Sequence, residues 1–157
     1  MITIKVNSEC CQNLDITPVK LVIDQLLAQR SLEIDDNKIS FAIDFPRDPQ
    51  DPRELSEIPE IRLWFIRVDT LYPWLPIILD WQQGELARYV AMLVPHQFHP
   101  RDGILYNPEA LEIFLQQKIF VVADWLKDQG IFSKSKLIAM AQMLGYNLDE
   151  EFFDFIS

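Results

Sequence analysis

Two histidines and one carboxylate lie close together and are the residues best suited to chemistry in this chain. His96 and His99 form an H-x-x-H pattern between Pro95 and Pro100, and Asp102 follows. Two imidazoles and a carboxylate are a ligand set for transition metals. A zinc site, however, normally shows a third and a fourth ligand at recognisable spacing, and the chain contains only two histidines. A small metal-dependent enzyme built on this loop is therefore the alternative hypothesis, and a structural or partner-facing loop is favoured.

No other pattern points to catalysis or to a bound cofactor. Neither histidine lies near a serine or cysteine of the G-x-S-x-G kind, and no glycine-rich phosphate loop is present. Cys10 and Cys11 are the only cysteines, and as sequence neighbours they do not suit ordinary disulfide geometry. They also lack the C-x-x-C spacing of iron-sulphur ligands. We therefore predict reduced thiols, no cofactor, no metal ion and no enzymatic activity.

Composition and charge narrow the class of protein. The chain has 157 residues, of which 49% are apolar and only four are glycine, and this favours one compact domain over residues 1–157. A net charge of −10 repels phosphate backbones, so no nucleic acid is expected as a partner. The longest apolar runs, 75–79 and 119–123, are far shorter than the roughly 20 residues of a membrane span. The first residues resemble neither a secretion signal nor a transit peptide, which favours the cytoplasm.

The periodicity of apolar residues predicts a small β-sheet against which the remaining elements pack. Residues 2–6 and 39–45 alternate apolar and polar side chains, which is typical of half-buried strands. Residues 61–69 are apolar on both alternating faces and are predicted to form the central strand, with Trp64 in the middle of the sheet. Residues 46–60 hold four prolines and five acids, so we expect an exposed, mobile loop there.

Helical spacing governs most of the remaining sequence. We predict helices over residues 18–30, over residues 75–94 with Pro76 in the first turn, and over residues 108–128 after an Asn107 cap. Ser133 caps a fourth helix that stops at Gly145, and a last short helix places Phe152, Phe155 and Ile156 on one side. The fold class is α+β: a small sheet of about three strands packed with a helical C-terminal half.

Aromatic residues and one arginine define a candidate partner-binding surface. Trp74, Trp81 and Arg88 are seven residues apart and share one face if a single helix carries them. His96 and Phe98 follow in the next loop, and residues 61–100 are electrically neutral within an acidic chain. Tryptophan and arginine are enriched at binding hot spots, so these five residues are the candidate surface. A second buried layer against the helix at 108–128 is the competing, structural interpretation of the tryptophan face.

Four motifs between residues 63 and 114 resemble those of a known family. They are LWFIRVD at residues 63–69, YPWLP at 72–76, GELARYVAMLVPHQF at 84–98 and YNPEALEIF at 106–114. On these motifs the chain resembles the chlororespiratory reduction 6 family, small soluble proteins of cyanobacteria and chloroplasts. The resemblance is best over residues 61–126 and loose over the first sixty.

The resemblance implies a role that composition alone does not supply. It implies an assembly factor that helps to build the soluble, ferredoxin-side arm of the photosynthetic NADH dehydrogenase-like (NDH-1) complex by transient protein–protein binding. The implied partner is a soluble subunit of that complex, in particular its iron-sulphur subunit. Stable insertion into the membrane is not implied, and the cyanobacterial, cytoplasmic form of the family is expected.

Overall fold

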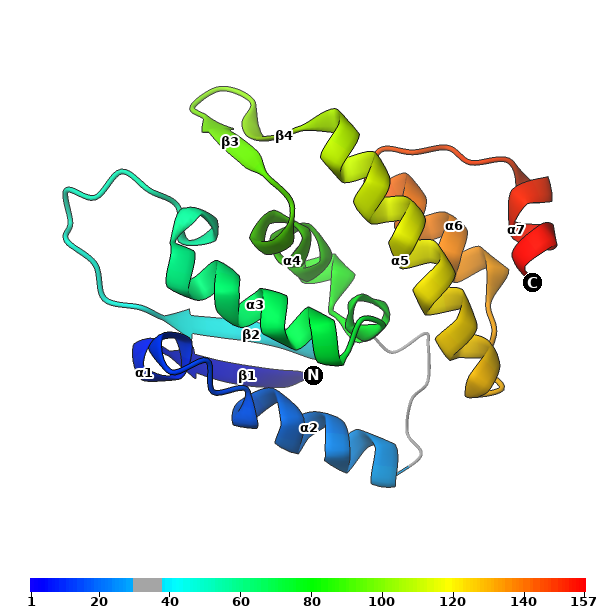
Figure 1. The fold of residues 1–157 in the computed structure, drawn as a ribbon, viewed down its shortest axis with the longest axis horizontal. Coiled ribbons are helices and arrows are strands. Elements are labelled where there is room, and N and C mark those ends of the chain that lie inside the picture. Colours follow the sequence, from blue (N-terminus) through cyan, green and yellow to red (C-terminus); the bar gives the residue numbers. More distant parts are fainter. Residues whose placement is uncertain (30–37) are drawn as a thin grey trace.

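The computed structural model describes residues 1–29 and 38–157, which form an α+β fold (Figure 1). The predicted fold class is thereby confirmed. The first 93 residues contain β1 (Ile2–Asn7), α1 (Ser8–Gln12), α2 (Thr17–Ala28), β2 (Ile39–Asp44), α3 (Pro59–Leu71) and α4 (Glu85–Leu93). The C-terminal half contains the hairpin β3 (His96–His99) and β4 (Gly103–Tyr106), followed by α5 (Pro108–Asp128), α6 (Lys134–Met143) and α7 (Glu150–Ile156).

The first two predicted strands form a parallel pair. In β1 and β2, Ile2 is paired with Ile39 and the register continues to Asn7 and Asp44. A parallel pair needs a crossover connection, and α1 and α2 supply it. The predicted first helix is confirmed as α2, although its predicted last residue, Arg30, lies outside the described residues.

The predicted central strand is wrong, because residues 61–69 lie inside α3. Pro59 occupies the first turn of this helix, where its missing N–H costs nothing. Ile61, Trp64, Phe65 and Val68 are all buried, and their spacing of three and four residues is that of a helical face. The alternating pattern was misleading because Leu63 and Ile66, which it assigned to buried faces, are 53% and 43% exposed.

The predicted second helix is broken into three pieces. Two 3₁₀ turns, η2 (Leu75–Ile78) and η3 (Trp81–Gln83), precede α4. Pro76 lies in the first turn, and the Asp80 carboxylate caps the second by accepting from the Gln83 N–H. Gly84 then adopts a positive φ of 76°, which glycine permits without steric cost. Between the turns, Leu79 forms a single parallel bridge with Ile39, so this short segment occupies the place of a third strand.

A second, antiparallel pair of strands was not predicted. Strands β3 and β4 pair from His96 with Tyr106 to His99 with Gly103. Each strand has only four residues, which is too short to show a clear period. Gly103 has a φ of 73°, which suits the turn between them.

The helices of the C-terminal half agree with the sequence prediction. Asn107 caps α5 by accepting from the N–H groups of Glu109 and Ala110, and the hydroxyl of Ser133 caps α6. The predicted last helix is α7, in which Phe155 is 87% exposed whereas Phe153 and Ile156 are buried. None of the helices in the described ranges is long and apolar enough to cross a bilayer.

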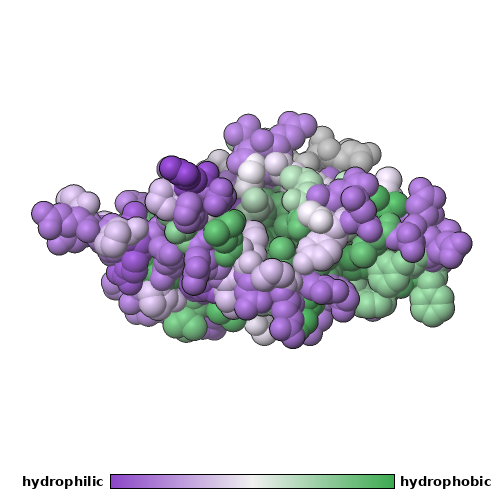
Figure 2. All heavy atoms as spheres, turned by 90° about the horizontal axis from the view of Figure 1, so that it is seen from above, coloured by the Kyte–Doolittle hydropathy of each residue, from purple (hydrophilic) through white to green (hydrophobic). Residues whose placement is uncertain are grey.

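The acidic loop at 46–60 divides into an exposed part and a packed part. Residues 46–50 and 52–54 are exposed, and the loop projects from one end of the molecule (Figure 1). Its end forms the turn η1 (Leu55–Glu57), where Ser56 and the following Ile58 are buried. Figure 2 shows hydrophilic residues at the projecting end and a gathering of apolar residues at the opposite end of the molecule. The expectation of full exposure therefore holds for the first part of the loop only.

Candidate partner-binding site

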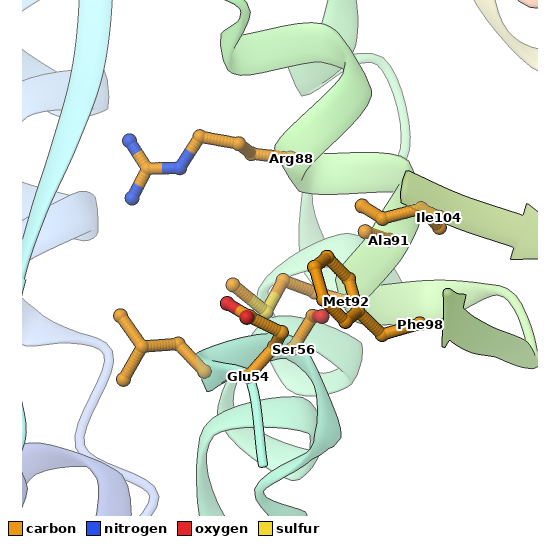
Figure 3. Close-up of a pocket in the computed structure, with 8 residues that line it drawn as sticks. Glu54, Ser56, Arg88, Ala91, Met92, Phe98 and Ile104 are labelled. Atoms are coloured by element: carbon orange, nitrogen blue, oxygen red, sulfur yellow. The ribbon is translucent and has the colours of Figure 1, made fainter. Parts of the chain in front are cut away.

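A hollow of about 170 Å³, open to solvent, lies where η1, α4 and the β3–β4 hairpin meet (Figure 3). Its walls are mainly apolar, with one acid and one base among them. The lining residues are Glu54, Leu55, Ser56, Arg88, Ala91, Met92, Phe98 and Ile104. Phe98 is 46% and Ile104 37% exposed, so the hairpin presents apolar side chains to solvent at this place. Concave, mostly apolar surfaces with few polar groups are typical binding sites.

His96 fixes the hairpin against the turn on the other side of the hollow. Its Nδ1 lies 3.1 Å from the Val94 carbonyl oxygen and its Nε2 lies 2.9 Å from the Ser56 hydroxyl. A carbonyl only accepts, so Nδ1 donates to it, and in the neutral ring Nε2 then accepts from the Ser56 hydroxyl. The imidazole also packs edge-on against Tyr106 of β4, with ring centroids 6.0 Å apart. This histidine therefore positions the site instead of contacting a partner through a free nitrogen.

Arg88 combines a structural contact with a place on the rim of the hollow. Its Nη1 lies 2.8 Å from Oε1 of Glu85 and 3.5 Å from the Phe41 carbonyl oxygen. Oε2 of Glu85 accepts from the Phe41 N–H at 3.3 Å. The side chain of Glu85 is 5% exposed, whereas that of Arg88 is 44% exposed. The ion pair therefore stabilises a buried carboxylate while part of the guanidinium stays accessible.

A comparison with known protein families agrees with the resemblance that the sequence motifs indicate. The family model described as chlororespiratory reduction 6 matches residues 6–155. The chain belongs to this family. The resemblance inferred from the motifs at 63–114 is thereby confirmed and extends over the N-terminal sixty residues, where the motifs are weak. No solved structure matches the chain significantly.

In this chlororespiratory reduction 6 protein the five predicted surface residues do not share one face. Trp74 and Trp81 are each 8% exposed and lie in separate turns, so the single helix that would have aligned them with Arg88 does not exist. Trp74 stacks on Trp125 of α5, with centroids 4.1 Å apart and an interplanar angle of 7°. The competing interpretation, a buried layer against the helix at 108–128, thus describes Trp74.

Trp81 likewise has structural contacts. Its Nε1 donates to the Pro76 carbonyl oxygen at 2.9 Å, and the Lys136 ammonium lies 4.1 Å from the ring centroid.

Of the five predicted surface residues, Arg88 and Phe98 do line one hollow, and His96 supports it. Sequence reasoning missed Glu54, Ser56 and Ile104, because they come from segments whose proximity to α4 only the tertiary structure creates.

The histidines and Asp102 are not arranged as a metal centre. His99 Nδ1 lies 3.3 Å from Asp102 Oδ2 and accepts from the Arg101 N–H, while His96 binds Ser56. Within residues 1–29 and 38–157, no group of three or more histidine, cysteine, aspartate or glutamate side chains is arranged to hold a metal ion. The geometry therefore gives no support to the metal-dependent alternative.

A buried polar cluster connects α3, α4 and α5 away from the hollow. The Lys118 ammonium donates to Asp69 Oδ1 at 2.5 Å and to the Pro73 carbonyl at 2.9 Å, and Tyr89 donates to the same Asp69 oxygen at 3.2 Å. Burial lowers the pKa of Lys118, and the Asp69 charge partly opposes this shift. Burial, and then the Asp69 charge, raise the pKa of Tyr89 well above its usual range. The side chains of Lys118, Asp69 and Tyr89 are joined by hydrogen bonds, so we assign the cluster a structural role.

Proposed function

We propose that this protein is an assembly factor of the photosynthetic NDH-1 complex that binds a soluble subunit of the ferredoxin-side arm transiently. The hollow between η1, α4 and the hairpin is the binding site, and the iron-sulphur subunit is the expected partner. The protein binds this subunit in the cytoplasm, before the subunit joins the complex. Membership of the chlororespiratory reduction 6 family supports the connection with NDH-1.

The observation that carries the proposed site is the exposure of Phe98 on a hairpin held in one position. A half-exposed aromatic ring on a fixed strand buries apolar area on binding at little cost in conformational entropy. Arg88 supplies an accessible guanidinium beside it, and both residue types are favoured at hot spots. An assembly factor must release its partner, and a small binding site suits this because it limits the interface area.

The test is complementation of a cyanobacterial strain from which the gene for this protein has been deleted. Wild type, Phe98→Ala and Phe155→Ala are each expressed in it, and assembled NDH-1 is measured on native gels with an antibody to the iron-sulphur subunit. Phe155 is the matched control, because it is an exposed phenylalanine at the far end of the molecule. The free energy of unfolding of both variants should lie within about 0.5 kcal/mol of the wild-type value, since neither ring is buried.

We expect Phe98→Ala to lower the amount of assembled complex severalfold and Phe155→Ala to leave it unchanged. Normal assembly with Phe98→Ala would remove the hollow from consideration as the binding site. Normal assembly in the deletion strain itself would refute the assembly function.

A further inference from the structure

The edge of β2 that faces α4 is completed by side chains instead of a full third strand. Asp80 donates its N–H to the Ile39 carbonyl at 2.8 Å, as a neighbouring strand would. Two residues further along, Glu85 accepts from the Phe41 N–H and Arg88 donates to the Phe41 carbonyl. These two side chains thus supply the acceptor and the donor that a partner strand would offer at this position.

Beyond Phe41 the same edge continues without a partner. Backbone groups alternate between the two edges of a strand, so those of Ile43 and then Phe45 follow Phe41 on the side away from β1. In the described parts of the chain, neither residue makes a hydrogen bond on that side. Pro46 follows and ends the run. An edge of this kind is a template for pairing with another extended chain.

The open edge leads to the hollow. Arg88 and Met92 line the hollow, and they also line the narrow crevice over Phe41 and Ile43. Figure 3 shows Arg88 reaching from α4 towards β2, and Phe98 on the hairpin side of the hollow. A strand that pairs with Ile43 would direct alternate side chains towards the apolar walls of the hollow. Main-chain bonds would then supply affinity, and the hollow would supply selectivity.

The charge around the open edge of β2 indicates which kind of chain can bind there. Residues 44–60 carry six carboxylates and only two arginines. Arg53 is already bound to Asp51, with Nη2 and Oδ2 2.8 Å apart, and Arg47 donates to the backbone of Arg53. Both arginines are thus engaged within the loop, and the surroundings favour a positively charged chain over an acidic one.

We propose that the β2 edge at Ile43 and Phe45 binds an extended segment of a partner protein in which basic residues alternate with apolar ones. The segment adds to β2 as a short strand and places its apolar side chains in the hollow beside Phe98. This inference rests on the proposed function, since it gives the chemistry of the segment that the assembly partner presents.

The first test uses synthetic nonapeptides and the full-length protein. The probe peptide alternates valine or isoleucine with lysine or arginine and carries a fluorophore. One control peptide has the same side chains but an N-methyl group on every residue, which removes the backbone donors on both edges of the strand. A second control replaces the bases by glutamate. Fluorescence anisotropy should show that the probe binds at least about tenfold more tightly than either control, a difference of about 1.4 kcal/mol.

The second test locates the site with two charge reversals of equal size. Asp44→Lys changes an exposed acid at the end of β2, and Asp124→Lys changes an exposed acid on α5. Asp44→Lys should weaken probe binding about fivefold, whereas Asp124→Lys should leave it nearly unchanged because the charge lies far from the edge. Hydrogen exchange should show that the probe slows exchange of the Ile43 amide but not that of the Ala42 amide, which faces β1.

Three results would overturn the proposal. They are no probe binding, equal binding of the N-methylated peptide, and equal weakening by the two charge reversals, which would indicate general attraction to an acidic protein. These outcomes are independent of the complementation test: the peptides can fail to bind while Phe98→Ala still impairs assembly. Conversely, peptide binding with normal NDH-1 in the deletion strain would leave the site intact and refute the function.

Discussion

The carboxylate of Glu85 on α4 lies 3.3 Å from the backbone nitrogen of Phe41 on β2 and accepts its hydrogen bond. An acidic side chain, only 5% exposed, thereby takes the place of a strand as hydrogen-bond acceptor. The partly exposed Arg88 neutralises this charge from the same helix. This contact fixes α4, and with it one wall of the hollow, to the sheet.

Removing the Glu85 carboxylate should destabilise the fold. Glu85→Ala leaves the Phe41 N–H without its acceptor, and a lost hydrogen bond to a buried charged group costs about 1.5 to 3 kcal/mol. Glu85→Gln keeps an acceptor of the same size and should cost less. Urea unfolding of both variants measures the difference. Equal stability of Glu85→Ala and wild type would show that water replaces the carboxylate at no cost.

Trp64 on α3 should be among the most costly residues to truncate. It is fully buried, and its Nε1 donates to the Asp15 carbonyl oxygen at 2.7 Å. Trp64→Ala should lower the free energy of unfolding by about 3 to 5 kcal/mol, because a large cavity and an unpaired carbonyl remain. Leu63→Ala, at the adjacent exposed position, is the control and should change it by about 0.5 kcal/mol or less. The predicted strand would instead have given both residues buried faces and similar costs.

The cluster of Lys118, Asp69 and Tyr89 should respond to removal of the ammonium. The side chain of Lys118 is 7% exposed, so Lys118→Met leaves the Asp69 carboxylate with the Tyr89 hydroxyl but without its charged partner and should cost about 3 kcal/mol. The double variant with Asp69→Asn should recover part of this loss, because no unpaired charge remains. Thermal or urea unfolding of the set forms a double-mutant cycle. Additive losses would show that the two charges do not interact.

The two cysteines should differ in reactivity. Cys11 is 1% exposed and Cys10 is partly exposed. Burial, and then the charges of Cys10 and Glu60, raise the pKa of the Cys11 thiol from its ordinary 9.0 to about 11. A disulfide reagent at pH 8 should therefore modify one thiol in the native protein and both in denaturant. Rapid modification of both native thiols would mean that α1 opens readily.

The same shift predicts a dependence of stability on pH. The folded state keeps the Cys11 proton more tightly than the unfolded chain does, so the contribution is complete below pH 9 and is lost as the pH rises towards 11. Urea midpoints of wild type should fall over this window more steeply than those of Cys11→Ala. Parallel curves would assign the alkaline loss to other groups, such as Tyr89.

The exposed part of the acidic loop should be cut first by a protease. Arg47 and Arg53 are exposed and lie in residues 46–54, ahead of the packed turn η1. Brief treatment with trypsin should cleave after one of them before it cleaves within α3 or α5. Mass spectrometry of the first fragments identifies the bond. Initial cleavage inside a helix would show that the hydrogen bonds that Asp48 and Asp51 accept from backbone N–H groups of the loop hold it rigidly.

The sequence predicted the elements whose signals are local. The β1 and β2 alternation, the Asn107 and Ser133 caps and the long helix α5 depend on residues within a few positions of one another. The strand prediction for residues 61–69 is wrong because these residues are apolar at enough positions to fit both a period of two and a period of 3.6. Gly84 and Pro76 were visible, but the segment between them was assigned to one helix because its leucines recur at helical spacing.

What the sequence determined by itself was the α+β class, most of its helices, and membership of the chlororespiratory reduction 6 family through contiguous motifs. Only the tertiary structure decided that Trp74 and Trp81 pack inwards, that Arg88 pairs with a buried Glu85, and that His96 bonds to Ser56. Ser56 and His96 are forty residues apart. Contacts at such separation depend on how whole elements pack and bury their apolar faces, and local spacing carries no record of that arrangement.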